Sequence, residues 1–80
     1  MRVNIVTGDG IKHKYTVENL DSAMDIIKDY AKENNLNYEG PSNGTIILDT
    51  DKPKLLGIAH FFKHTDSAKH YEGSAFIWSK

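Results

Sequence analysis

The chain of 80 residues contains no cysteine, a single arginine and no long hydrophobic run. The lack of cysteine excludes disulfides, thiolate nucleophiles and zinc–thiolate sites, so side-chain packing alone must hold the fold. No apolar stretch approaches the roughly 20 residues that cross a membrane as a helix. The opening MRVNIVTGDG is too short and too strand-like for a signal peptide. We therefore expect a cytoplasmic protein with no membrane partner.

Length and charge narrow the expectation further. Residues 1–80 should form one domain, because a chain of this size supports one two-layer core and little room for an enclosed substrate pocket. The net charge of −1 is unevenly divided, since residues 1–51 carry five basic and nine acidic side chains and residues 52–80 carry five and two. Nine lysines, eight isoleucines and six asparagines are typical of an AT-rich coding sequence. They indicate a low-GC bacterium or one of its phages.

The first 17 residues alternate apolar and polar side chains, which predicts two half-buried strands. A three-residue loop, Gly8-Asp9-Gly10, places the apolar groups of both strands on one face, and Gly10 suits the left-handed position of such a loop. His13 is then expected as a partly buried, neutral imidazole. The predicted register pairs Thr7 with Ile11, Ile5 with His13 and Val3 with Tyr15.

ENLDSAMDIIKDYAKENN, residues 18–35, predicts a helix that Asn19 or Asp21 caps and Asn34-Asn35 ends. An apolar stripe along it should pack on the buried face of the sheet. The stripe consists of Leu20, Ala23, Met24, Ile26, Ile27, Tyr30 and Ala31.

The second half predicts short strands separated by loops. In order these are a strand at residues 36–38, a loop at EGPSNG, a strand at TIILDT (residues 45–50), a break at residues 51–54, and the strands LLGIAHFFKH and HYEGSAFIW around TDSAK. The order ββαβββ predicts an α+β fold, with a single helix packed on a mostly antiparallel sheet of about five strands.

The opening, two strands followed by a helix, resembles the β-grasp (ubiquitin-like) pattern over roughly the first half of the chain. The chain ends FIWSK, without the diglycine that conjugation requires, so we expect no modifier role. The same order of elements is also similar to that of many small phage-encoded inhibitor proteins.

HFFKHTDSAKHYE, residues 60–72, concentrates three of the four histidines. On a helix His60 and His64 would share a metal, but the flanking apolar runs favour a hairpin, where they lie roughly 13 Å apart. A loop at residues 65–69 would instead set His64 opposite His70, with Glu72 on the diagonal, as a possible three-ligand metal site. Because no supporting second shell is visible, a solvated hairpin end is the favoured interpretation.

Catalysis and cofactor binding are not expected. A Ser-His-Asp set drawn from His64, Asp66 and Ser67 would crowd into one turn and lack the separated, rigid supports that a nucleophile and its base need. No glycine-rich sequence here has the spacing of a phosphate-binding loop.

An acidic ridge is predicted on the helix, formed by Asp21, Asp25, Asp29 and Glu33. Recurrence every four residues places the carboxylates about 6 Å apart, where like charges weaken a helix by a few tenths of a kcal/mol per pair. The ridge is either an ordinary solvated helix face or a docking site for the basic surface of a nucleic-acid-binding host protein.

The last hairpin has two faces of nearly equal hydrophobicity. One carries Ile58, Phe62, Phe76 and Trp78, and the other carries Ala59, Phe61, Tyr71, Ala75 and Ile77. A single helix covers only one of them, so a second copy of the chain or another protein should cover the other.

The leading hypothesis is a non-enzymatic protein-interaction module, of the kind that phages or mobile elements use to inhibit a host protein (anti-CRISPR or another anti-defence type). Its predicted contacts are the acidic ridge and Phe62, Phe76 and Trp78. The alternatives are a small metal-binding protein using His64, His70 and Glu72, and an oligomer, such as a homodimer, that binds a small ligand between subunits. Direct nucleic-acid binding is not expected, because the overall charge is near zero and the C-terminal lysines form a modest patch without arginine.

Overall fold

The computed structural model describes residues 1–43, 54–65 and 68–79. Within these ranges it contains one helix and five strands in the order ββαβββ, which confirms the predicted α+β fold. The strand predicted at residues 45–50 lies outside the described residues, as do residues 51–53 of the predicted break and residues 66 and 67. The elements are β1 (Arg2–Thr7), β2 (Lys12–Thr16), α1 (Leu20–Glu33), β3 (Asn37–Asn43), β4 (Leu55–Thr65) and β5 (Ala68–Trp78).

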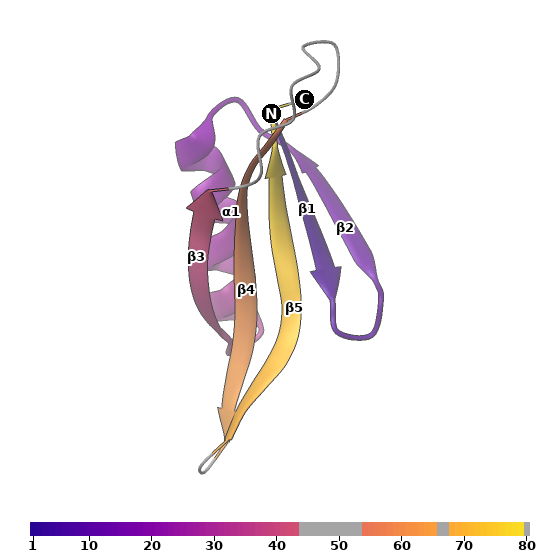
Figure 1. Cartoon of the computed structure of the whole chain (residues 1–80), viewed down its shortest axis with the longest axis vertical. Coiled ribbons are helices and arrows are strands. Elements are labelled where there is room, and N and C mark those ends of the chain that lie inside the picture. Colours follow the sequence, from indigo (N-terminus) through magenta and orange to yellow (C-terminus); the bar gives the residue numbers. More distant parts are fainter. Residues whose placement is uncertain (44–53, 66–67, 80) are drawn as a thin grey trace.

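The strands form one sheet in the order β2-β1-β5-β4-β3, and every neighbouring pair is antiparallel. The helix lies behind this sheet in Figure 1, so the molecule has two layers. β1 and β5 pair at the centre, which brings the start of the first strand beside the end of the last one. We call the face of the sheet that packs on α1 the inner face and the opposite face the outer face.

The β1–β2 hairpin has the predicted register. Val3 lies opposite Tyr15 and Ile5 opposite His13, while the Thr7 amide donates to the Ile11 carbonyl at 2.9 Å. Gly10 closes the loop with a φ of 91°, in the left-handed region expected of it.

The helix begins and ends where its polar residues predict. The Asn19 side chain accepts a hydrogen bond from the Ser22 amide at 2.9 Å, and Asn35, with φ 53°, turns the chain out of the helix. Ala23, Ile27 and Ala31 are buried, as the stripe predicted. Leu20 was predicted in the stripe but is 50% exposed, because first-turn side chains tilt past the helix N-terminus.

The interpretation of EGPSNG as a loop is wrong, because β3 continues through it to Asn43. β3 is an edge strand, and its register against β4 shifts between Glu39 and Ser42. Pro41 therefore lies at a bulge on the edge of the sheet, where the amide that proline lacks costs no central ladder bond.

β4 and β5 pair as predicted near the core, with Ile58 opposite Phe76. Beyond the core the register shifts by one residue between Phe61 and Phe62. The shift is absorbed at Gly73, whose φ is 144° and where an added Cβ would stand 2.5 Å from the Val6 carbonyl oxygen. Only glycine fits this close approach of β1 to the bulge.

The core lies between α1 and the inner face. Phe61, Ile5, Ile27, Ile77 and Val3 are its largest fully buried side chains. Alanines on α1, β4 and β5 complete the interface and allow the helix to lie close to the sheet. Among the residues with described structure, no helix is long and apolar enough to cross a membrane.

β4 and β5 are longer than the rest of the fold. The molecule measures 45 × 21 × 21 Å, and its long axis follows this hairpin past the end of β1 (Figure 1). The exposed part, residues 63–65 and 68–71, forms a two-stranded extension that we call the distal arm.

Candidate functional site

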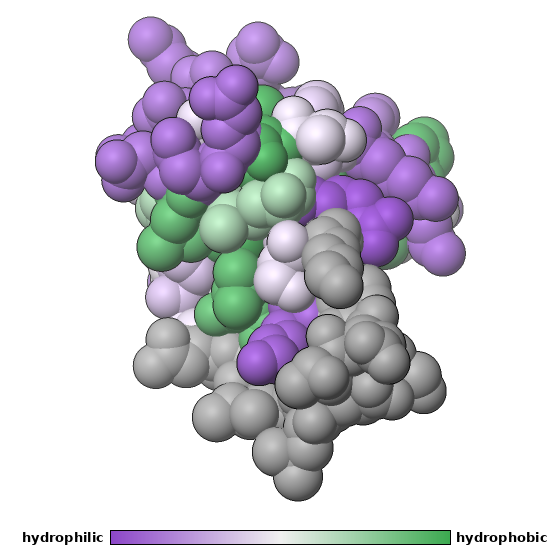
Figure 2. Space-filling view, turned by 90° about the horizontal axis from the view of Figure 1, so that it is seen from above, coloured by the Kyte–Doolittle hydropathy of each residue, from purple (hydrophilic) through white to green (hydrophobic). Residues whose placement is uncertain are grey.

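The acidic ridge of Asp21, Asp25, Asp29 and Glu33 lies on the solvent side of α1, and all four residues are exposed. Each step of four residues drifts by about 40° around a helix, so the ridge winds slightly but stays opposite the buried alanines. Figure 2, a view onto the end of the molecule where β5 finishes, shows hydrophilic side chains over this side. Exposure alone does not test binding, so the docking role of the ridge stays a prediction.

The structure decides which face of the last hairpin the helix covers. Ala59, Phe61, Ala75 and Ile77 are buried on the inner face. The outer face carries the half-buried side chains Ile58, Phe62, Phe76 and Trp78.

The face predicted for Tyr71 is wrong. The register shift moves Tyr71 opposite Phe62, onto the outer face, where it is 58% exposed. Its hydroxyl lies 2.5 Å from the hydroxyl of Ser74, which in turn lies 3.0 Å from Nδ1 of His60. The outer face is therefore more aromatic than alternation alone predicts.

Basic side chains border the outer face. Because Ile5 faces inward, its neighbours Asn4 and Val6 face outward, and Lys14 and Lys12 lie directly opposite them on β2. These residues, with Phe76 and Trp78, line a shallow depression of about 320 Å³. The alternation Lys12-His13-Lys14 in the sequence already contains this signal, because it places both lysines on the face opposite His13.

The other end of the outer face is also basic. Lys69 lies over the Phe62 ring, with its Nζ atom 3.9 Å from the ring centroid, and it forms an ion pair with Glu39.

Two buried polar atoms of this face, Nε of Arg2 and Oδ1 of Asn4, have no hydrogen-bond partner among the described residues.

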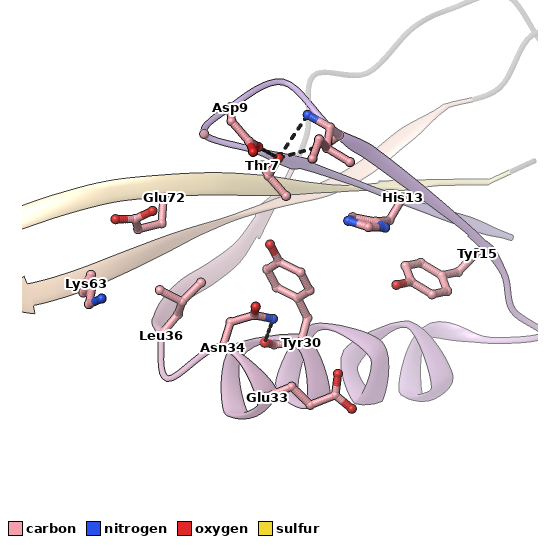
Figure 3. Close-up of a pocket in the computed structure, with 12 residues that line it drawn as sticks. Thr7, Asp9, His13, Tyr15, Tyr30, Glu33, Asn34, Leu36, Lys63 and Glu72 are labelled. Carbon is pink, nitrogen blue, oxygen red and sulfur yellow. Dashed lines mark hydrogen bonds between the residues drawn. The ribbon is translucent and has the colours of Figure 1, made fainter.

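The predicted pairing of His64 with His70 is wrong. Past the bulge, His64 lies opposite Lys69 and His70 opposite Lys63, so the two imidazoles point to opposite faces of the hairpin. Within the described ranges no three histidine or acidic residues come close enough to hold a metal. Glu72 lies at the bulge and points to the inner side, into a cavity that does not include either histidine (Figure 3).

This cavity was not foreseen from the sequence. It has a volume of about 620 Å³ and lies between the β1–β2 turn, the last turn of α1 and the base of the distal arm. Its walls include Thr7, Asp9, His13, Tyr15, Tyr30, Leu36, Lys63 and Glu72. His13, predicted as a partly buried core imidazole, is instead exposed at this cavity, because the core ends at Ile5 and Phe61.

The hydroxyl of Tyr30 points into the cavity (Figure 3). Desolvation raises the pKa of Tyr30 above its usual value, and the charges of Asp9 and Glu72 raise it further. A hydrogen bond from Thr7 lowers the pKa of Asp9, so this carboxylate stays ionised at neutral pH. The described lining carries more acidic than basic side chains, since Asp9, Glu33 and Glu72 stand against Lys63.

No known protein-family model, curated protein or solved structure matches this chain.

Proposed function

We propose that this protein is a non-enzymatic interaction module that binds another protein through the outer face of its sheet. The observation that supports the proposal is the composition of that face. Four half-buried apolar side chains, Ile58, Phe62, Phe76 and Trp78, lie on it, and the last two line one depression with the exposed lysines Lys12 and Lys14. Burial of apolar surface is the main favourable term in most protein–protein association, whereas charges chiefly steer the encounter.

The partner surface should be apolar at its centre and acidic at its rim. Acidic groups would complement the exposed Lys12 and Lys14. Glu39, the one described acidic side chain beside the outer face, is already paired with Lys69, so a second copy meeting outer face to outer face offers little acidic surface to Lys12 and Lys14. This favours a different protein over a second copy.

An inhibitor of a host protein, encoded by a phage or mobile element, is the form of this function that we propose to test first, with anti-CRISPR and other anti-defence proteins as examples. Small size and AT-rich residue usage support it. An inhibitor that acts by steric docking needs a contact surface but no catalytic group, and the outer face supplies such a surface.

The test uses charge reversal on two sides of the molecule. Lys12→Glu with Lys14→Glu changes the outer face, and Lys28→Glu with Lys32→Glu makes the same charge change on the exposed side of α1. A host protein captured by the wild type is purified and its Kd measured by calorimetry. We expect the outer-face variant to bind at least about tenfold more weakly and the helix variant to stay within about twofold.

Two results would contradict docking through the outer face. Equal Kd values for the wild type and the outer-face variant would exclude this face as the docking surface. Loss of binding in an Asp25→Lys, Asp29→Lys variant would assign docking to the acidic ridge instead.

A third result would change the class of partner. Saturable binding of a single-stranded oligonucleotide, lost in the outer-face variant, would show that the face binds nucleic acid rather than protein, because aromatic and basic side chains together also suit unstacked bases.

A further inference from the structure

The cavity on the inner side of the sheet is open to solvent and has the volume of a small-ligand site. Its volume of about 620 Å³ falls in the roughly 300–1,000 Å³ range of small-molecule pockets. Three separate parts of the fold form its walls, so the side chains converge from different directions (Figure 3). The walls are the β1–β2 hairpin, the C-terminal turn of α1 and the β4–β5 hairpin at Lys63 and Glu72.

One wall of the cavity is aromatic. Tyr30 packs its ring against Phe61, with centroids 4.8 Å apart, so packing in the core holds the ring in place. The His13 ring lies 6.2 Å from Tyr30, and Tyr15 stands next to them on β2. The faces of tyrosine rings attract cations.

The charge of the cavity is negative. Asp9 on the β1–β2 turn and Glu72 on β5 both line it, and Lys63 is the one ammonium group among its described lining residues. The carboxylate of Glu33 is directed away from the cavity in Figure 3, so it contributes less. α1 also ends here, and the carbonyl end of a helix carries partial negative charge.

We propose that this cavity binds a small organic cation, an alkylammonium or guanidinium group. Tyr30 and Tyr15 present the aromatic surface, and Asp9 and Glu72 supply the counter-charge. The cation comes either from a free amine or from a lysine or arginine side chain of a bound protein. This site lies on the opposite side of the sheet from the docking face, so the two proposals stand or fall separately.

The test is an NMR titration of the full chain with putrescine, with an end-blocked Gly-Lys-Gly peptide and with succinate as the matched dianion. Putrescine represents the free amine and the peptide represents a partner's side chain. We expect saturable shifts at Tyr15, Tyr30 and Glu72 with at least one cation and none with succinate. The cation that binds more tightly identifies the source.

Variants that each remove one charge locate the site. Glu72→Gln should weaken cation binding about tenfold, because it removes a charge-assisted contact. Asp25→Asn makes the same charge change on the ridge and should leave the Kd unchanged. Lys63→Gln removes the one competing ammonium group and should tighten binding by about twofold to fivefold. Folding of each variant is checked by its amide spectrum.

The proposal is overturned if neither cation gives saturable shifts up to about 10 mM. It is equally overturned if succinate binds as well as the cations, or if Glu72→Gln and Asp25→Asn bind alike.

Discussion

Phe61 and Phe62 are neighbours in the sequence with the same side chain, and they have different physical roles. Phe61 is fully buried beneath α1, whereas Phe62 is half-buried on the outer face under the ammonium group of Lys69. The difference arises because successive side chains of a strand point to opposite faces. Phe61 therefore stabilises the core, whereas Phe62 is part of the proposed contact surface.

Truncating each phenylalanine separates these roles. Phe61→Ala should lower the free energy of unfolding by about 3–5 kcal/mol, because it leaves a cavity in a closed core. Phe62→Ala should lower it by less, by about 2 kcal/mol, since that ring is only partly buried and its truncation leaves no closed cavity. Urea denaturation followed by circular dichroism measures both changes. Equal losses for the two variants would contradict the assignment of the inner and outer faces.

At the scale of elements, bulges within the strands determine which side chains the following regular segments place on each face of the sheet. The bulge at Gly73 shifts the distal arm by one residue relative to the core end of the hairpin. As a result Tyr71 joins the outer face and His64 and His70 point apart. The bulge in β3 at Pro41 similarly lets a sequence typical of a loop continue as an edge strand.

Replacing Gly73 by alanine tests the bulge. The new Cβ would stand 2.5 Å from the Val6 carbonyl oxygen in a backbone conformation that alanine rarely adopts. We expect the variant to lose at least about 2 kcal/mol of unfolding free energy.

Gly8→Ala is the matched control for this prediction. There the nearest atom to an added Cβ is 3.6 Å away, which is an ordinary contact. Thermal and urea unfolding should give a change within about 0.5 kcal/mol for the control. A Gly73→Ala protein as stable as the control would show that β1 and the bulge do not approach so closely.

For the whole molecule, the main feature is the separation of charge between its two layers. The exposed side of α1 carries the acidic ridge, and the outer face carries Lys12, Lys14 and Lys69, with Glu39 as its one described acidic neighbour paired to Lys69. Such a molecule is electrically polar despite a net charge of −1. Association through either layer should therefore depend on ionic strength.

The ridge should have a measurable cost to stability. Asp29→Lys replaces repulsion from Asp25 and Glu33 with attraction and places a cation in the C-terminal half of α1, so the unfolding free energy should rise by about 0.5 kcal/mol at low salt. Asp29→Asn, which only removes the repulsion, should give a smaller gain. Thermal unfolding at low ionic strength and at about 1 M salt, where exposed charges are screened, distinguishes the charge effect from a change in helix propensity. A gain that persists at high salt would contradict it.

Local patterns in the sequence predicted the elements and much of the register. The alternation in the first 17 residues, the capping asparagine at position 19 and the apolar spacing of the helix act between residues close in the chain, so the sequence alone was sufficient for the first hairpin and α1. The acidic ridge follows from the same helical spacing, and so does its position on the solvent side. These features need no knowledge of distant partners.

Contacts between distant segments decided the rest. Which face of β4 and β5 lies inward depends on where α1 packs, and glycine is required at position 73 because β1 passes against the bulge. The negative cavity requires Tyr30, Asp9 and Glu72 to meet from three elements. No local periodicity encodes such a meeting, because a shift of one residue in strand pairing reverses every side chain beyond it.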